Sequence, residues 1–506
     1  MSKLILGIEL GSTRIKSVLC NGQGKVIASG MHEWENEYRD GHWTYSMQAV
    51  TEGLQSSFKD LVKEYGEPVT TLDAIGISAM MHGYLAFDED WNLLEPFRTW
   101  RDTTTAQAAE ILSKELQFNM PQRWSATHYY QAILNREKTV DKVAHLQTLS
   151  GYVHYMLTGK KVIGANDASG MFPLNGGDYD GEMLKKFNLL VGRDFKELLP
   201  EVLLAGQNAG VLTKEGAMIL DPKGALKPGV PFCPPEGDMG TGMVCTNAVA
   251  PRTANVSSGT CANLTVVLEK PLKNYYPQID IISTPDGKPA ALVHTNNCTT
   301  EINEWVSLFY EVANLSGANI SKEELFTKLF EKSLESDNQT GGLTGYNFLA
   351  GEPQAHTANG APLVVRGSNG KLNLANFMQT QIYSAISALS LGKDILEKED
   401  VKIDSVTAHG GFYKTEFVGQ NATSALLCAP VTVMENAGEG GAWGIALLAG
   451  YVLTNGISLP EYLNNIFEGV EKKTVTATDG EIAKCRNFII RYKKYLEVEQ
   501  AASEIK

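Results

Sequence analysis

Cysteine is scarce and scattered in this sequence. Seven cysteines occur among 506 residues, and they form no Cys-x-x-Cys pair and no Cys/His cluster with zinc spacing. They are Cys20, Cys233, Cys245, Cys261, Cys298, Cys428 and Cys485. An odd, dispersed set argues against a disulfide framework and against a structural zinc site. It indicates reduced thiols, so we expect a cytoplasmic protein.

Long hydrophobic runs and an excess of basic residues are also lacking. The apolar run near Ile445–Leu453 is far too short to span a bilayer, and the first residues turn polar too early for a signal peptide. The formal net charge is −14, which argues against nucleic acid or an anionic membrane as the main partner. A pocket can still be locally positive, so a phosphate ligand stays open.

Two common nucleotide-binding motifs are missing from the N-terminal segment. Short apolar runs over residues 4–10, 17–20 and 25–29 predict an antiparallel meander. Its first turn carries Gly11, Ser12, Thr13, Arg14 and Lys16. The turn has neither the Gly-Lys-Ser/Thr of a P-loop nor the three glycines of a Rossmann fingerprint. It is therefore either a plain hairpin or a phosphate-binding hairpin of another kind.

The middle of the chain holds one carboxylate in a glycine-lined turn. Asp238 follows Gly237 and precedes Gly240 and Gly242, and small neighbours would leave its carboxylate open to a ligand. Residues 253–269 then predict two strands joined at a tight turn. That turn is Ser258, Gly259 and Thr260, which offers N–H groups and hydroxyls to an anion. The pair of turns is either a base beside a phosphate cradle or two ordinary surface turns.

Length and pattern predict two α/β domains. A chain of 506 residues is long for one hydrophobic core, and we place the boundary near residue 250, giving domains over 1–250 and 251–506. Each half would then begin with a hairpin whose turn carries small hydroxyl side chains, which predicts a structural repeat without a sequence repeat.

Strands and helices alternate in the expected element order. In the first half, the pattern predicts a helix over 43–65 and a strand over 72–78. In the second half, it predicts a glycine-rich loop over 338–351, a helix over 377–393 and a strand over 401–408. The strand over 401–408 runs into His409, Gly410 and Gly411, and a glycine pair before a helix suits a flat or anionic ligand.

Three polar groups stand out against their apolar surroundings. Glu9 lies inside the first predicted strand, where it is either a magnesium ligand or a carboxylate at a strand edge. His82 follows the predicted strand over 72–78, at the end where ligands bind in open α/β sheets. Residues 97–102 combine rings, guanidinium groups and a carboxylate, which suits a polyol or a surface ion pair.

Taken in order, these motifs resemble the FGGY family of carbohydrate kinases. The matching segments are Gly7–Thr13, Gly76–Gly83, Gly237–Asp238, Val256–Thr260, Gly410–Gln420 and Glu439–Gly444. The resemblance spans nearly the whole chain. It implies two actin-like (ribonuclease H-like) α/β domains with an interdomain catalytic cleft. The N-terminal domain would hold the sugar and the base, and the C-terminal domain the nucleotide.

The resemblance also implies an activity and a set of site residues. Asp238 would be the base that takes a proton from a sugar hydroxyl as it attacks the γ-phosphate of ATP. ATP would be bound by Gly11, Ser12, Thr13, Lys16, Ser258, Gly259, Thr260, Gly410, Gly411 and Lys414. The sugar would contact Met81, His82, Trp100, Arg101, Asp102 and Asp238. Glu9 would serve Mg²⁺, and a homodimer is left open.

Two departures from the family pattern leave details open. Glu9 stands where the family usually has Asp, which puts the magnesium geometry in question. His409 stands where xylulose kinases tend to have glycine, and the segment after it looks closer to ribulose kinases. Substrate identity is therefore open between ketopentoses of the D-xylulose and L-ribulose type. The alternative is an actin-like ATPase of a chaperone or filament class, which would need no polyol pocket.

Overall fold

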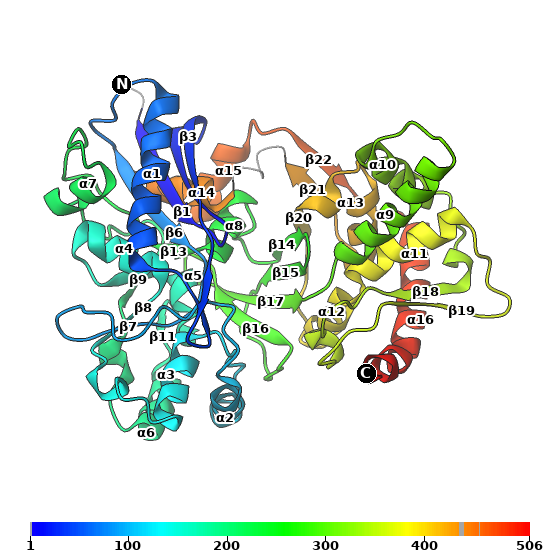
Figure 1. Cartoon of the computed structure of the whole chain (residues 1–506), viewed down its shortest axis with the longest axis horizontal. Coiled ribbons are helices and arrows are strands. Elements are labelled where there is room, and N and C mark those ends of the chain that lie inside the picture. The colour runs from blue at the N-terminus through cyan, green and yellow to red at the C-terminus, as the bar shows by residue number, and fades with distance from the viewer. Residues whose placement is uncertain (1–2, 435–439, 455, 506) are drawn as a thin grey trace.

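Two β-sheets form the two halves of the molecule. The computed structural model describes residues 3–434, 440–454 and 456–505. The N-terminal sheet has the order β13-β6-β1-β2-β3 and lies on the left of Figure 1. Its strands are β1 (Leu4–Leu10), β2 (Arg14–Asn21), β3 (Val26–Glu33), β6 (Ala74–Ala79) and β13 (Glu236–Gly237).

The C-terminal sheet is larger and has the order β16-β17-β15-β14-β20-β21-β22. Its strands are β14 (Thr253–Ser258), β15 (Ala262–Val267), β16 (Ile279–Ser283), β17 (Pro289–Thr295), β20 (Ser405–His409), β21 (Val431–Met434) and β22 (Lys472–Val475). Short strand pairs outside the two sheets are β4 (Glu37–Arg39) with β5 (His42–Thr44), β7 (Leu85–Phe87) with β8 (His145–Gln147), β9 (Val162–Gly164) with β12 (Glu201–Leu203), β10 (Leu174–Asn175) with β11 (Asp178–Tyr179) and β18 (Leu343–Tyr346) with β19 (Leu363–Arg366).

The two sheets repeat one topology. In the first, β1 pairs antiparallel with β2 and parallel with β6, and β6 pairs parallel with β13. In the second, β14 pairs antiparallel with β15 and parallel with β20, and β20 pairs parallel with β21. The predicted structural repeat is confirmed. In each sheet, adjacent parallel strands end at one edge, where ligands bind in α/β proteins.

Helices surround both sheets. They are α1 (Met47–Tyr65), α2 (Ala106–Leu116), α3 (Ser125–Leu134), α4 (Leu149–Thr158), α5 (Ala165–Ala168), α6 (Gly181–Val191), α7 (Lys214–Leu220), α8 (Asp238–Cys245), α9 (Thr300–Leu315), α10 (Lys322–Ser333), α11 (Leu374–Ser387), α12 (Leu389–Lys398), α13 (Val418–Leu427), α14 (Gly440–Val452), α15 (Leu459–Phe467) and α16 (Asp479–Ser503). α1 begins where the Ser46 side chain accepts from the Ala49 N–H, and it ends at Gly66 with φ 86°.

One helix from late in the chain covers the N-terminal sheet. In Figure 1, α14 lies among the blue strands of the left half, and it packs against β1, β6 and α8. A Cβ on Gly7 would lie 2.1 Å from the Ala442 carbonyl oxygen, and one on Gly76 would lie 2.7 Å from the Ile445 carbonyl oxygen. The helix backbone therefore rests directly on two strands, and only glycine fits beneath it.

Three predicted elements differ from the structure. Residues 42–44 form β5, so α1 begins at Met47 rather than at residue 43. Residues 374–398 form two helices that meet at Ala388, not one. The predicted loop over 338–351 contains β18, because residues 363–366 supply a pairing strand that a local pattern does not show.

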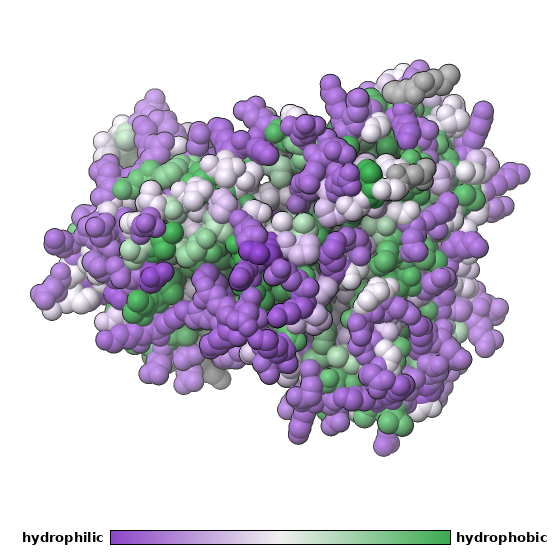
Figure 2. Space-filling view, turned by 180° about the vertical axis from the view of Figure 1, so that it is seen from behind, coloured by the Kyte–Doolittle hydropathy of each residue, from purple (hydrophilic) through white to green (hydrophobic). Residues whose placement is uncertain are grey.

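The hydrophobic residues are mostly inside. Figure 2 shows a face covered mainly by hydrophilic residues, with hydrophobic ones in small groups between them. Within the described part of the chain, no helix is both long enough and apolar enough to cross a bilayer.

Candidate active site

Three neighbouring strands bring the predicted N-terminal site residues together. The parallel strands β1, β6 and β13 end at Leu10, Ala79 and Gly237. The Met80 N–H donates to the Leu10 carbonyl oxygen at 3.0 Å, and the Met81 N–H donates to Asp238 Oδ1 at 3.2 Å. The first hairpin turn, the Met81–His82 segment and Asp238 therefore share one edge of the sheet.

Asp238 is the first residue of α8, and it combines solvent exposure with a crowded setting. The residue is exposed by surface area, yet the protein atoms around it displace enough water to raise the pKa of its carboxyl to about 6. Hydrogen bonds from the Met81 and Met239 N–H groups work in the opposite direction. A carboxylate with a raised pKa and an open face is suited to accept a proton.

The glycines around Asp238 serve packing as well as access. A Cβ on Gly237 would lie 2.0 Å from Met81 Cγ, and one on Gly240 would lie 2.6 Å from Asn166 Cγ. Space is open only at Gly242 among these three. Two of the three glycines thus let neighbouring side chains approach the start of α8.

Glu9 is held by the start of α14. Its Oε2 accepts from the Ala442 N–H at 3.2 Å, and a Cβ on Gly441 would lie 2.2 Å from Oε1. Burial, and then the charge of Asp238, raise the pKa of Glu9 to about 7, while Lys16, its partner across the β1–β2 hairpin, lowers it.

A magnesium ion would find oxygen ligands here but no complete protein cage. Over the described ranges, no group of three His, Cys, Asp or Glu side chains could hold a metal. Mg²⁺ commonly binds through one or two carboxylates, several waters and substrate phosphates. Glu9 and Asp238 interact electrostatically and fit that donor set. Glu9 is the longer of the two acids and already accepts from α14.

His82 is buried in a backbone conformation that is unusual for a side chain of its size. Its φ is 73°, and only 5% of its surface is exposed. Burial, and then the positive charge of Arg123, hold the pKa of His82 well below its ordinary value. The imidazole is therefore neutral near pH 7, so one ring nitrogen can donate to a hydroxyl group and the other can accept from one.

Residues 100–102 are already engaged within the N-terminal half. Trp100 is 43% exposed, and its Nε1 donates to Ser12 Oγ at 3.2 Å. The Arg101 guanidinium lies 4.1 Å from the centre of the Trp43 ring. The Asp102 carboxylate is buried and hydrogen-bonded by His42 and Thr104. The structure thus ties Trp100 to the first hairpin and leaves its ring accessible.

The C-terminal candidates also converge, at the edge where β14 and β20 end. Ser257 and His409 are register partners, so the turn at 258–260 lies beside Gly410. Gly410 has φ 109°, and a Cβ there would lie 2.2 Å from the Ser258 carbonyl oxygen. Space around Gly259 and Gly411 is open, and Thr260 and Lys414 are exposed. The two turns form one glycine-rich edge that a ligand could approach.

A buried polar cluster lies behind Asp238, in a region where the sequence pattern of residues 166–171 left open either a site lining or a helix cap. Asp167 accepts hydrogen bonds from Thr148 and Ser150, and Glu236 accepts one from the Asp167 N–H at 3.1 Å. Burial raises the pKa of Asp167 to about 7 and that of Glu236 well above its ordinary value. The run Asn166–Met171 is polar between apolar segments, which was the only available signal.

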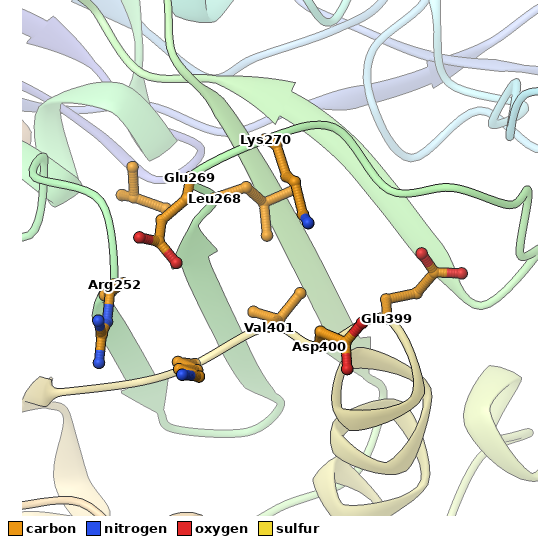
Figure 3. A pocket seen from close by; sticks show the side chains of 9 residues that line it. Arg252, Leu268, Glu269, Lys270, Glu399, Asp400 and Val401 are labelled. Atoms are coloured by element: carbon orange, nitrogen blue, oxygen red, sulfur yellow. The ribbon is translucent and has the colours of Figure 1, made fainter.

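A charged pocket lies elsewhere on the C-terminal sheet. It is lined by Arg252, Val267, Leu268, Glu269, Lys270, Glu399, Asp400, Val401 and Lys402 (Figure 3). Arg252 immediately precedes β14, so this pocket lies at the opposite end of that strand from Ser258. It is therefore separate from the candidate site.

Comparisons with known proteins agree with this arrangement. The sequence profile of the FGGY family of carbohydrate kinases, N-terminal domain, matches residues 4–245, and that of the C-terminal domain matches residues 254–453. Xylulose kinase from Haemophilus influenzae is 25% identical over 511 residues, covering 97% of this chain and 99% of its own. Xylulose kinase from Escherichia coli is 22% identical, covering 82% of this chain and 83% of its own.

Solved structures share the fold. Gluconate kinase from Lactobacillus acidophilus superposes with a TM-score of 0.83 at 18% identity, covering 99% of each chain. The ligand-bound xylulose kinase from Lactobacillus acidophilus gives a TM-score of 0.81 at 18% identity, again covering 99% of each chain. With both profiles matched in order and the repeated sheet topology, the chain belongs to the FGGY family of carbohydrate kinases.

Proposed function

We propose that this carbohydrate kinase transfers the γ-phosphate of ATP to a hydroxyl of a ketopentose, of the D-xylulose or L-ribulose type, with Asp238 as the base. The observation that carries the proposal is the placement of Asp238. Its carboxylate is exposed, has a raised pKa, and is held by the Met81 N–H at the edge where three parallel strands end. The similarity to xylulose kinases along nearly the full chain supports the ketopentose.

The proposed reaction needs one proton transfer. The sugar hydroxyl oxygen attacks the γ-phosphorus, the bond from that phosphorus to the bridging oxygen of ADP breaks, and the hydroxyl proton passes to Asp238. Such a base typically contributes about 10²–10⁴-fold to the rate. In phosphoryl transfer, most of the remaining rate enhancement comes from positioning the reactants and neutralising phosphate charge.

Phosphate contacts would come from both hairpins. Ser12 and Thr13 follow β1, with Lys16 on β2, and the turn Ser258–Thr260 joins β14 to β15. Gly410, Gly411 and Lys414 follow the adjacent strand β20 and would contact the rest of the nucleotide. Glu9 would hold Mg²⁺ through water, and the ion would neutralise phosphate oxygens.

Sugar contacts would come from the N-terminal half. Neutral, buried His82 and Met81 would contact the sugar beside Asp238, and Trp100 would offer an exposed ring face. Arg101 and Asp102 are engaged by Trp43 and by His42, so in this proposal they orient the Trp100 loop or rearrange on binding.

The test is ADP release with Mg-ATP across D-xylulose, L-ribulose, D-ribulose, L-xylulose, glycerol and gluconate. We expect one ketopentose to stimulate turnover and Asp238→Asn to lower kcat by about 10²–10⁴-fold. ADP release at one slow rate, independent of sugar and of Asp238, would instead favour a nucleotide-driven ATPase. Stimulation by gluconate or glycerol alone would keep the kinase and change its substrate.

A further inference from the structure

A short buried helix connects the catalytic half of the molecule to the C-terminal sheet. α5 packs against α8, β13 and β16. β16 belongs to the C-terminal sheet, while α8 begins with Asp238. α5 is therefore in contact with both the helix that carries the base and the opposite domain.

Asn166, on α5, uses both ends of its carboxamide in this contact. Its Oδ1 accepts from the Gly240 N–H at 2.8 Å, and its Nδ2 donates to the Ser283 carbonyl oxygen at 2.7 Å. Gly240 lies in the first turn of α8, where N–H groups lack partners within the helix. One side chain thus satisfies a donor of the catalytic helix and an acceptor of β16.

The surroundings fix this side chain in place. Asn166 has no exposed surface, and Ser283 is 4% exposed. A Cβ on Gly240 would lie within 2.7 Å of three side-chain atoms of Asn166. A second bond runs in parallel, because the Ser283 N–H donates to Ser169 Oγ at 3.0 Å. In such a buried site, each hydrogen bond that is lost leaves a buried group unpaired.

We propose that Asn166 is a positioning residue that ties the start of α8, and with it Asp238, to strand β16 of the C-terminal sheet. The inference rests on the proposed function, because it concerns the placement of the proposed base. The N-terminal half carries Asp238, and the turns at 258–260 and 410–411 belong to the C-terminal half. A link between β16 and α8 therefore sets where the base stands relative to the bound nucleotide.

Both hydrogen bonds at position 166 require an amide side chain, which has a donor and an acceptor at its end. Alanine removes both hydrogen bonds, and aspartate keeps an acceptor for the Gly240 N–H but offers no donor to the Ser283 carbonyl. Ser169→Ala removes the parallel bond to β16 and leaves the contact with α8 intact. The three substitutions therefore separate the two ends of the link.

Asn119 supplies a matched control. Its Nδ2 donates to Asp280 Oδ1 on β16 at 2.6 Å, so Asn119→Ala also deletes an amide hydrogen bond from the N-terminal half to the same strand. Its bond does not involve α8. A general loosening of the two halves would affect both asparagine variants alike, whereas the proposed link affects only Asn166.

The experiment measures kcat and KM with the sugar that stimulates turnover, per folded enzyme, for wild type, Asp238→Asn and the four variants. We expect Asn166→Ala to lower kcat at least about tenfold, since misplacing a reacting group by 1 Å can cost about 10²-fold. The KM for ATP should change by less than about twofold, and Asn119→Ala should keep kcat within about twofold of wild type. The kcat values of Asn166→Asp and Ser169→Ala should lie between those of wild type and Asn166→Ala.

Equal kcat in wild type and Asn166→Ala, with Asp238→Asn inactive, would overturn the inference and leave the base assignment standing. Retained turnover in Asp238→Asn would instead overturn the proposed function. If Asn166→Ala does not fold, Asn166→Asp decides, and a wild-type kcat there would show that the link to Ser283 has no role in catalysis.

Discussion

The two sheets share one topology and similar hairpin turns, but their site edges differ in charge. Glu9 lies in β1, two residues before the turn glycine Gly11. Ser257 lies in β14, two residues before the turn glycine Gly259. Their partners on the next parallel strand are Ser78 and His409. Both edges have a turn with glycine and hydroxyl side chains, and the N-terminal edge adds two carboxylates, Glu9 and Asp238. A topology supplies positions, and the side chains at its strand ends decide what those positions do.

The sheets also differ in how they are covered. At Gly7, four residues before Gly11, the backbone of α14 lies on the strand. At the corresponding position of β14, Asn255 has a side chain whose Nδ2 donates to Thr246 Oγ1 at 2.8 Å. The N-terminal sheet accepts a helix backbone at this point, and the C-terminal sheet does not.

The largest loss of stability should come from filling the space beneath α14. Gly7→Ala places a Cβ 2.1 Å from the Ala442 carbonyl oxygen and 2.7 Å from the Ala446 nitrogen. We expect the free energy of unfolding to fall by about 3 kcal/mol, because neither backbone can yield without moving a helix or a strand. Chemical denaturation measures it.

Gly242→Ala is the control for that measurement. Space around Gly242 is open, and alanine favours a helix, so stability should be unchanged or rise by up to about 1 kcal/mol. Equal stability of Gly7→Ala and wild type would mean that α14 is not seated on β1 as described.

Gly410→Ala probes the C-terminal edge in the same way. Its φ of 109° and the 2.2 Å approach to the Ser258 carbonyl oxygen both oppose a side chain. We expect a loss of about 1–3 kcal/mol in the free energy of unfolding and a higher KM for ATP, because the two turns separate. Gly411→Ala, in open space, should keep wild-type stability, and a similar loss in both variants would contradict the close approach.

The mildest change is one of pH alone, and it should reveal the acidic edge of the N-terminal sheet in the activity profile. The folded pKa of Asp238 is raised to about 6, and a base acts only when deprotonated. The kcat/KM should therefore be level above pH 7 and fall about tenfold per pH unit below about 6. An ordinary Asp would place that decline below pH 4. A flat profile down to pH 4.5 would show that Asp238 is not the titrating base.

Local patterns in the sequence predicted the strands of both hairpins well. Residues 4–10 and 253–258 alternate or continue as buried β-rich runs, and glycine with small hydroxyl residues marks each turn. The same patterns failed where the deciding partner is distant. Strand β18 depends on residues 363–366, and the break at Ala388 leaves no turn residue to announce it.

The residues of the candidate site also divide into those recognisable from a local pattern and those whose role depends on distant partners. Asp238, His82, Gly410 and Glu9 could each be singled out, because a polar or glycine residue inside or just after an apolar run is recognisable from the sequence alone. For Asn166 the sequence left open a site lining or a helix cap, and it could not show the actual contacts, since the partners Gly240 and Ser283 lie 74 and 117 residues away. Hydrogen bonds between segments that meet only after folding leave no local pattern.

By itself, the sequence determined the α/β class, the repeated hairpins, the family and the identity of the exposed acid, because these depend on side-chain type and short spacing. Only the tertiary structure decided that α14 returns to the N-terminal sheet and that α5 links α8 to β16. It also decided that Glu9 is held by the start of α14. The physical reason is that burial, close backbone approach and pKa shifts depend on atoms brought together from across the chain, and these have no counterpart in the order of residues.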